Sequence, residues 1–555
     1  MYNRPVSYAR RPTMRIQVQL PLFAWVCLED APALVTLRRL FETIPDGPLL
    51  ESLRTWRGRG RNDYPVLVLW RVVVLTMALR HRDVEACLGE LRRNPSLQKI
   101  AGIESPEQIP NGWNVSRFLD VLGQDPHRPH LEEIFNVMAQ RLGRAVPDLG
   151  ESTAGDSTWL NARRTRADAQ KHKEEMEQKK AADAGKESSR PAAASGPSEV
   201  ERGTHGPVPS QQPATIQGAT AAEGSADSAA DKRASKIELD KNGLPQPAGG
   251  RKEYKNEDGL VSRIVEWFGF KLHLLVDTRH EVSLAYRISS TKTGDNEMLP
   301  ILVDQAQANL PEGRMATLAY DKAADDAKVH QKLHESGIKP VIQNRSLWKE
   351  EHERMLPGHD GNSNIVYDEA GTLHCYDRVS TPMVRHRMAY IGHEPSRGTL
   401  KYRCPAMHEG WECPMSSRCN AGKKYGLTVR VKQEIDLRRF PAIPRATKQF
   451  ERLYKGRPAV ERVNARLKIF WGIDDGNVTG AARFHALVGT VMIVHEAFAT
   501  MLASLPRHEG SLGKMRLSPI AKAIDAQIRG KELPPKRPRR KKPRSSSERQ
   551  QRLFR

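Results

Sequence analysis

The stretch that decides the fold is YKGRPAVERVNARLK, at residues 454–468. It places Tyr454, Arg457, Glu461 and Lys468 at successive gaps of three, four and seven residues. On an α-helix, which turns by roughly 100° per residue, these four positions fall within an arc of about 60°. One carboxylate and three groups able to bind phosphate therefore share one stripe of the predicted helix, a combination that suits a metal ion and a phosphate ligand.

The opposite side of this helix is predicted to be apolar, so that it can pack on a sheet. The residues on that side are Val460, Val463, Leu467 and Phe470. Proline is tolerated in a first helical turn but not in a helix interior, so Pro458 predicts that the helix restarts near Arg457, with Tyr454 just outside it. A solvated face of mixed charge, with Glu461 merely paired to an arginine, is the alternative interpretation.

The chain has 555 residues and a formal net charge of +22, from 88 Lys and Arg against 66 Asp and Glu. Its length leaves room for two to four domains of roughly 100–200 residues each. The large positive charge favours a polyanionic partner, nucleic acid first. No signal-peptide pattern opens the sequence, so a cytoplasmic protein is expected. Six cysteines in so long a chain do not indicate a disulfide framework.

One stretch, residues 486–505, is apolar enough to resemble a membrane span. It carries His495 and Glu496 near its middle, and ionisable residues are costly in lipid. We therefore predict a buried core helix and no membrane association.

Composition divides the rest of the chain into segments. Residues 1–150 show helical periodicity and predict an all-α N-terminal domain. Residues 166–253 have hardly an aromatic residue and predict a disordered linker or insertion. Residues 344–445, rich in Gly, Pro, Arg and Cys, predict a second insertion. Residues 506–555 contain the basic run KRPRRKKPR and predict a disordered tail.

The remaining segments, 151–165, 254–343 and 446–505, carry strand and helix patterns. The runs 267–276 and 282–288, separated by a polar turn, predict a β-hairpin. Helices and strands then alternate: helix 296–309, strand 315–320, helix 325–336 and strand 338–342. This alternation predicts an α/β layer with parallel strand pairing in its second half.

Partners for Glu461 as a metal ligand are expected at strand ends, where a sheet holds carboxylates rigidly and close together. Asp156 lies in a short extended segment, and Asp321 directly follows the apolar strand MATLAY. Either residue, taken alone, is alternatively a turn residue or a helix cap. Three further aspartates are interpreted as turn or helix-start residues: Asp277, Asp325 and Asp326.

Four cysteines lie in the second insertion: Cys375, Cys404, Cys413 and Cys419. Four thiolates can close a tetrahedral site for a structural Zn²⁺. The gaps of nine and six residues between the last three differ from the usual C-x2-C spacing. Plain reduced thiols therefore remain the alternative.

Taken together, these motifs resemble the DDE transposases of bacterial insertion sequences. Four residues match the Y-x2-R-x3-E-x6-K signature that one class of these enzymes carries: Tyr454, Arg457, Glu461 and Lys468. Asp156 in GDST is similar to the first aspartate of the family, and Asp321 in AYDKAAD is similar to the second. The resemblance covers most of residues 60–165 and 254–505, and it implies that the helical N-terminal domain, residues 1–150, serves DNA binding and assembly.

The resemblance implies an α/β ribonuclease-H-like catalytic domain, a mixed sheet flanked by helices and interrupted by insertions. In it, Asp156, Asp321 and Glu461 would bind two Mg²⁺ ions, with Mn²⁺ as a substitute. Tyr454, Arg457 and Lys468 would hold DNA phosphates. The implied activity is cleavage at terminal inverted repeats of double-stranded DNA, followed by strand transfer of the 3′-OH ends into target DNA.

The same resemblance implies a homodimer in a synaptic complex, no nucleotide cofactor, and a bacterial protein associated with the nucleoid. Two other functions remain open. One is a catalytically silent DNA-binding protein descended from such an element, although a decayed copy should lose its metal ligands first. The other is a metal-dependent nuclease without strand transfer, which a joined DNA product would exclude.

Overall fold

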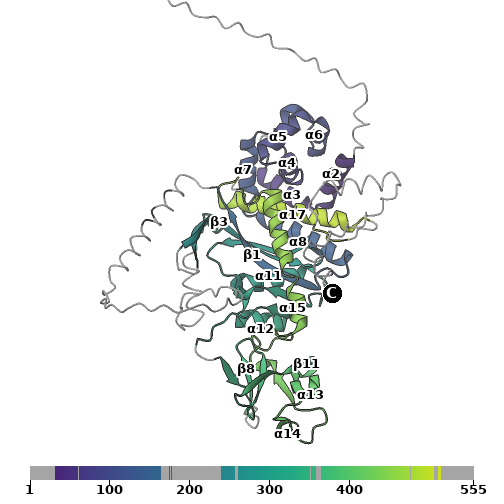
Figure 1. Cartoon of the computed structure of the whole chain (residues 1–555). Coiled ribbons are helices and arrows are strands. Elements are labelled where there is room, and N and C mark those ends of the chain that lie inside the picture. Colours follow the sequence, from purple (N-terminus) through teal and green to yellow (C-terminus); the bar gives the residue numbers. More distant parts are fainter. Residues whose placement is uncertain are drawn as a thin grey trace, which may run out of the picture.

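The computed structural model describes residues 32–59, 62–163, 239–256, 261–349, 352–357, 364–475, 477–505 and 510–513, together with positions 170, 174 and 177. Within this part of the chain, a helical region, a central sheet with its helices, and a small β-rich insertion follow one another along the long axis of the molecule (Figure 1). Most of the predicted linker and nearly all of the predicted basic tail lie outside the described residues.

Helices alone precede the first strand in the described chain. They are α2 (Pro32–Thr43), α3 (Gly47–Arg57), α4 (Val66–Ala78), α5 (Val84–Arg93), α6 (Pro95–Ala101), α7 (Gly112–Leu122) and α8 (Arg128–Ala145). Asp83, Asn94 and Asn111 each accept a hydrogen bond from the amide three residues on, which fixes the starts of α5, α6 and α7. The apolar helix α4 is buried among its neighbours.

A six-stranded mixed sheet follows. Its strands are β1 (Ser152–Asn161), β2 (Ala248–Lys255), β3 (Val261–Asp277), β4 (Ser283–Ser290), β5 (Thr317–Tyr320) and β6 (Lys339–Ile342). The long strand β3 pairs antiparallel with β1, β2 and β4. The pairs β1·β5 and β5·β6 are parallel. The predicted hairpin and the predicted parallel pairing in the second half are both confirmed.

The predicted linker ends too late, because residues 248–253 belong to strand β2. This strand pairs with the outer half of β3, from Ala248 opposite Gly269 to Lys255 opposite Val261. Its sequence, AGGRKEYK, lacks the apolar alternation of a half-buried strand, so composition alone pointed to disorder. Backbone hydrogen bonds to β3 hold these residues in a strand that their side-chain pattern does not predict.

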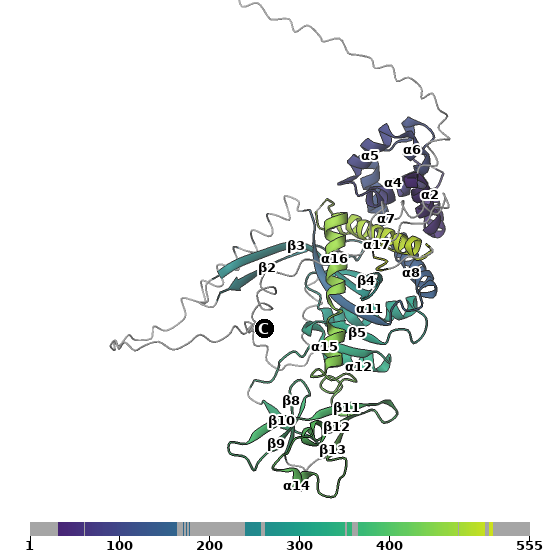
Figure 2. The same ribbon diagram turned by 45° about the vertical axis from the view of Figure 1, so that its right-hand side comes forward.

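Helices α11 (Asp295–Asn309) and α12 (Ala327–Glu335) lie close to their predicted positions, and α11 packs on β3 and β4. The β-rich insertion contains two small sheets, β7 to β10 and β11 to β13. Their strands are β7 (Glu353–Met355), β8 (Ile365–Asp368), β9 (Leu373–Asp377), β10 (Val384–Arg387), β11 (Ala389–Glu394), β12 (Thr399–Arg403) and β13 (Thr428–Lys432). The insertion has its own hydrophobic core and lies at the end of the molecule opposite the N-terminal helices (Figure 2).

The deciding stretch forms two helices, α15 (Lys448–Tyr454) and α16 (Pro458–Trp471). Pro458 is the first residue of α16, so the predicted restart is confirmed, and Tyr454 ends the preceding helix. Helix α16 packs on β1 and β3 through its predicted apolar side. Val460, Val463 and Leu467 are fully buried, but Phe470 is only half-buried and lies under the Arg80 guanidinium.

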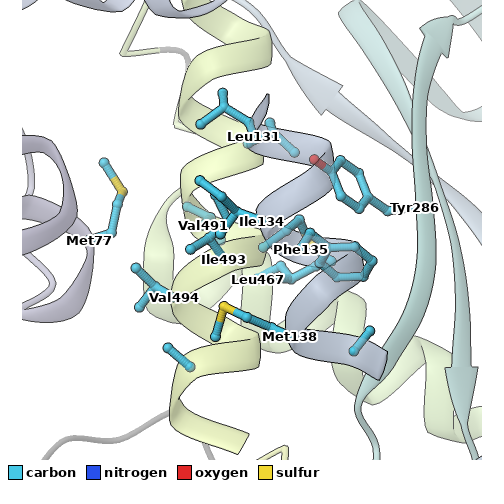
Figure 3. Packing of buried hydrophobic residues seen from close by; sticks show 14 of the residues in the cluster. Met77, Leu131, Ile134, Phe135, Met138, Tyr286, Leu467, Val491, Ile493 and Val494 are labelled. Atoms are coloured by element: carbon cyan, nitrogen blue, oxygen red, sulfur yellow. The ribbon is translucent and has the colours of Figure 1, made fainter. Parts of the chain in front are cut away.

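The last helix, α17 (Ala481–Ala503), joins the two main parts of the chain. It packs against α8, α7, α4 and α2, and also touches β4. Figure 3 shows Val491 and Val494 of α17 beside Ile134 and Met138 of α8. Among the described helices, α17 alone has the length and apolar composition to span a membrane, but it is mostly buried within the protein. The prediction of a buried core helix is confirmed.

Candidate active site

Asp156 and Asp321 lie on neighbouring parallel strands. The register of β1 with β5 pairs Ser152 with Thr317 and continues to Ala154 with Ala319. Two residues further along both strands come Asp156, inside β1, and Asp321, directly after the last residue of β5. The sheet therefore brings together two aspartates that are 165 positions apart in sequence.

Gly155 makes this approach of the strands possible. A Cβ at position 155 would lie 2.5 Å from Cε2 of Tyr320, and the Tyr320 ring is fully buried. Real Cβ atoms essentially never approach another atom so closely. The residue before Asp156 must consequently be glycine if Tyr320 is to keep its place before Asp321.

We expect Gly155→Ala to lower stability by about 1–3 kcal/mol, the usual cost of overpacking a core. Urea or thermal unfolding followed by circular dichroism measures this change. Gly392→Ala is the matched control, because Gly392 also lies in a strand but a Cβ there would meet nothing within 4 Å. Equal unfolding midpoints for the two variants would contradict the close packing of Gly155 on Tyr320.

Helix α16 brings the third acid to the same place. Arg457, at the N-cap position, lies between two carboxylates: its Nη1 is 3.7 Å from Oδ2 of Asp156, and its Nη2 donates to Oε1 of Glu461. Partial burial lowers the pKa of Arg457, but Glu461, Tyr454, Asp156 and Asp321 together raise it above its usual value. One guanidinium therefore faces three acids from three separate segments.

The ionised form of the Asp156 carboxyl is destabilised in the folded protein. Burial is the main cause, and together with the nearby charges of Asp321 and Asp295 it raises the pKa of Asp156 to about 6. The Ser157 amide, which donates to Oδ1 at 2.9 Å, and the Arg457 charge oppose this shift only in part. A buried carboxyl whose pKa is raised in this way beside further acids is typical of functional sites.

The remaining residues of the deciding stretch lie in two places. Tyr454 stacks on Phe450 at 5.8 Å, and its pKa is raised by burial, with Asp321 and Glu461 adding to the effect. Lys468 lies two turns beyond Glu461, where its Nζ donates to the Trp159 carbonyl at 2.6 Å and pairs with Asp474 at 3.1 Å. The structure thus brings Tyr454 and Arg457 to the acids and holds Lys468 at the far end of α16.

A fourth acid lies beside Asp156, namely Asp295 at the start of α11, which the sequence did not indicate as a site residue. Its carboxylate is close enough to raise the pKa of both Asp156 and Tyr320. Lys271 neutralises it at 2.6 Å, and His273 lies at 3.5 Å. Its place in a first helical turn carries no signal beyond the helix dipole, so only the fold reveals this neighbour.

The structure corrects the role predicted for Asp325. It was interpreted as a first-turn acid, but it is 4 % exposed and binds Arg438 and Arg445, each at 2.9 Å, and His330 at 3.0 Å. Its oxygen also accepts from the Arg345 amide. Both arginines lie at the C-terminal end of the insertion, so their ion pairs with Asp325 attach the insertion to the sheet domain. Asp326 keeps a helix-start role, at the N-cap of α12 rather than in its first turn. Asp277 accepts the turn amides of Arg279 and His280, as predicted, and also the amide of the distant Gly150.

The donor set of Asp156, Asp321 and Glu461 fits Mg²⁺ in its chemistry, because all the donor atoms are hard oxygens and the single charge of Arg457 offsets only part of their negative charge. In the described part of the chain, no three His, Cys, Asp or Glu side chains are grouped closely enough, as they stand, to hold a metal ion. Glu461 is 48 % exposed and paired with Arg457. It must turn away from that arginine to reach a cation shared with the aspartates.

The comparisons with known proteins agree with this geometry. Residues 234–496 match the family model described as a transposase DDE domain. The matched segment contains Asp321 and Glu461, while Asp156 precedes it. None of the curated proteins compared with the chain matches it. The match identifies residues 234–496 as a DDE transposase domain.

Proposed function

We propose that this transposase cleaves DNA at the terminal inverted repeats of its own element and transfers the freed 3′-OH ends into target DNA. The observation that carries the proposal is the convergence of Asp156, Asp321 and Glu461 on one guanidinium. The bacterial insertion-sequence origin, the Y-R-E-K subclass and the cytoplasmic location are parts of the same proposal. The first two rest on the signature of α15 and α16, and the third rests on the proposed DNA substrate.

The topology supports a ribonuclease-H-like catalytic domain. Its sheet runs β4, β3, β1, β5, β6, with the first three strands antiparallel and the last two parallel to β1. Helix α16 covers β1 and β3, and α11 packs on β3 and β4. This arrangement places two acids at the centre of the sheet and the third on a helix that crosses it.

In the proposed chemistry, Asp156, Asp321 and Glu461 would hold two Mg²⁺ ions. When bound, such ions activate an attacking oxygen and stabilise the leaving 3′ oxygen of a phosphodiester. Arg457 would move from the carboxylates to a DNA phosphate, which its planar guanidinium can bind with two hydrogen bonds. Tyr454 would contact the strand end beside it, and Lys468 would contact phosphate further along α16.

Each phosphodiester broken at a terminus yields one 3′-OH, and each joining step forms one phosphodiester while breaking another. No nucleotide cofactor is therefore needed. Two ends must be held together for joining, so we propose that a homodimer acts in a synaptic complex. Double-stranded DNA, as terminal repeat and as target, is the proposed substrate.

A donor plasmid carrying the native flanks of the gene around a marker tests the proposal. Purified wild type with Mg²⁺ should excise and join the marker, and Glu461→Gln should lower both activities by roughly 10³-fold, because metal-held charge supplies several kcal/mol. Glu451→Gln is the matched control, since Glu451 is exposed on the preceding helix α15. It should keep wild-type activity.

The other outcomes have distinct meanings. Cleavage without joined product would favour a nuclease that shares this site. Sequence-specific binding of the flanks without cleavage by the wild type would favour a silent DNA-binding protein. Undiminished joining by Glu461→Gln would remove Glu461 from the site.

A further inference from the structure

The four cysteines of the insertion converge, although they come from different elements. Cys375 lies in β9, and Cys404 precedes α13 (Pro405–Glu409) directly after β12. Cys413 lies in the following loop, and Cys419 ends α14 (Ser416–Cys419). All four line one narrow cavity of about 20 Å³, room for roughly a single water-sized sphere.

The cavity also receives hydrogen-bond donors directed at sulfur. Asn364 Nδ2 donates to Cys419 Sγ at 3.7 Å, and Asn420 Nδ2 donates to Cys404 Sγ at 3.6 Å. Burial raises the pKa of Cys413, and the Met415 amide opposes this shift in part. Amide donors of this kind orient sulfur ligands around a metal.

The four cysteines form no disulfides in the described part of the chain. All four are free cysteines, so no disulfide explains their convergence. Burial and the other three cysteines raise the pKa of Cys375 to about 12. Without a cation this thiol stays protonated at neutral pH, and a dication in the cavity would reverse the balance.

The segment of the insertion that carries Cys404, Cys413 and Cys419 has little regular structure. Between β12 and β13 the chain contains only helices of five and four residues. The core of the insertion consists of few buried side chains, and Cys404 is one of them. Small modules with little regular structure commonly depend on a metal or on disulfides for stability.

We propose that Cys375, Cys404, Cys413 and Cys419 bind one structural Zn²⁺ that crosslinks the two sheets of the insertion. Four sulfur ligands in a closed cavity are typical of structural zinc and leave no position for substrate. As the thiols stand they line the cavity without forming a grouped metal-binding set. Their side chains close around the ion, and each thiol releases its proton to solvent on binding.

The zinc content of the full-length chain, purified under reducing conditions and reconstituted with zinc, tests the proposal. Mass spectrometry of the metal should find one zinc per chain in the wild type. Cys375→Ser and Cys404→Ser should each lose most of it, and limited proteolysis should then cut the insertion faster. Cys87→Ala is the matched control: Cys87 is equally free but buried in the N-terminal helices, so the zinc content should not change.

Cobalt exchange of the intact wild type keeps the test decisive if the serine variants do not fold. Co²⁺ held by four thiolates gives intense sulfur charge-transfer bands and a tetrahedral visible spectrum. A weak octahedral spectrum would place the metal on carboxylate oxygens and overturn the proposal. Zinc-free wild type after reconstitution, or full zinc content in Cys375→Ser and Cys404→Ser, would overturn it as well.

Discussion

Asp156→Asn should abolish DNA cleavage and at the same time stabilise the folded chain. The loss of activity, roughly 10³-fold, follows from removing one of three anionic ligands. The gain in stability follows from the raised pKa, because ionising Asp156 near neutral pH costs free energy in the folded state. A neutral amide avoids this cost, which for a shift of this size is about 1–3 kcal/mol.

The raised pKa also determines how the stability difference between the wild type and Asp156→Asn changes with pH. The folded pKa of Asp156, about 6, lies above the usual aspartate value of 3.8. The stabilising contribution of the protonated carboxyl is therefore fully present below about pH 4 and is lost as the pH rises through about 6. The unfolding midpoint of Asp156→Asn should exceed that of the wild type at pH 7.5, and the two should converge at pH 4.

The matched control for this experiment is Asp304→Asn. Asp304 lies on α11 in the same domain, with a side chain 61 % exposed and an ion pair to Lys332. Its replacement should leave DNA cleavage intact and give no gain in stability at pH 7.5. An Asp156→Asn variant that cleaves DNA, or that unfolds more easily at pH 7.5, would contradict the electrostatic account of the site.

Asp325→Ala should be the most destabilising substitution outside the hydrophobic core. It leaves the buried guanidinium groups of Arg438 and Arg445 without their carboxylate, and breaking a buried ion pair from one side costs about 3–5 kcal/mol. Burial raises the pKa of Asp325, but hydrogen bonds from His330 and Arg438 and the charge of Arg445 outweigh it and lower the pKa to about 2. The network is therefore fully stabilising above about pH 4 and weakens as the pH falls towards 2.

Asp326→Ala is the control for this variant, one residue along the chain. It removes a helix cap at a half-buried position, which costs about 1 kcal/mol. Denaturant unfolding of both variants, with limited proteolysis to locate the loosened segment, measures the difference. Asp325→Ala should release the insertion for cleavage while Asp326→Ala does not. Similar unfolding midpoints for the two would show that Asp325 carries no more than a helix-start role.

The sequence predicted most elements of the sheet domain because their signals are local. The apolar run before Asp321, the turn at Asp277 and Pro458 at the start of α16 each act within a few residues of the chain. The positions of Asp321 and Glu461 followed from these elements and from the family signature. For the four cysteines, the sequence left a structural zinc site and plain reduced thiols both open, since nothing in the spacing shows that the loops return to one point.

The sequence by itself determined the order of helices and strands and the residue types of the site, since both depend on short-range preferences. Only the tertiary structure decided which distant residues meet. Strand β2 is ordered by backbone pairing with β3, and α17 is buried by helices more than 300 residues earlier. Asp325 receives its arginines from the other end of the insertion, and Asp295 lies beside Asp156 because α11 covers the sheet. Such contacts depend on how whole elements pack, which no local pattern of residues encodes.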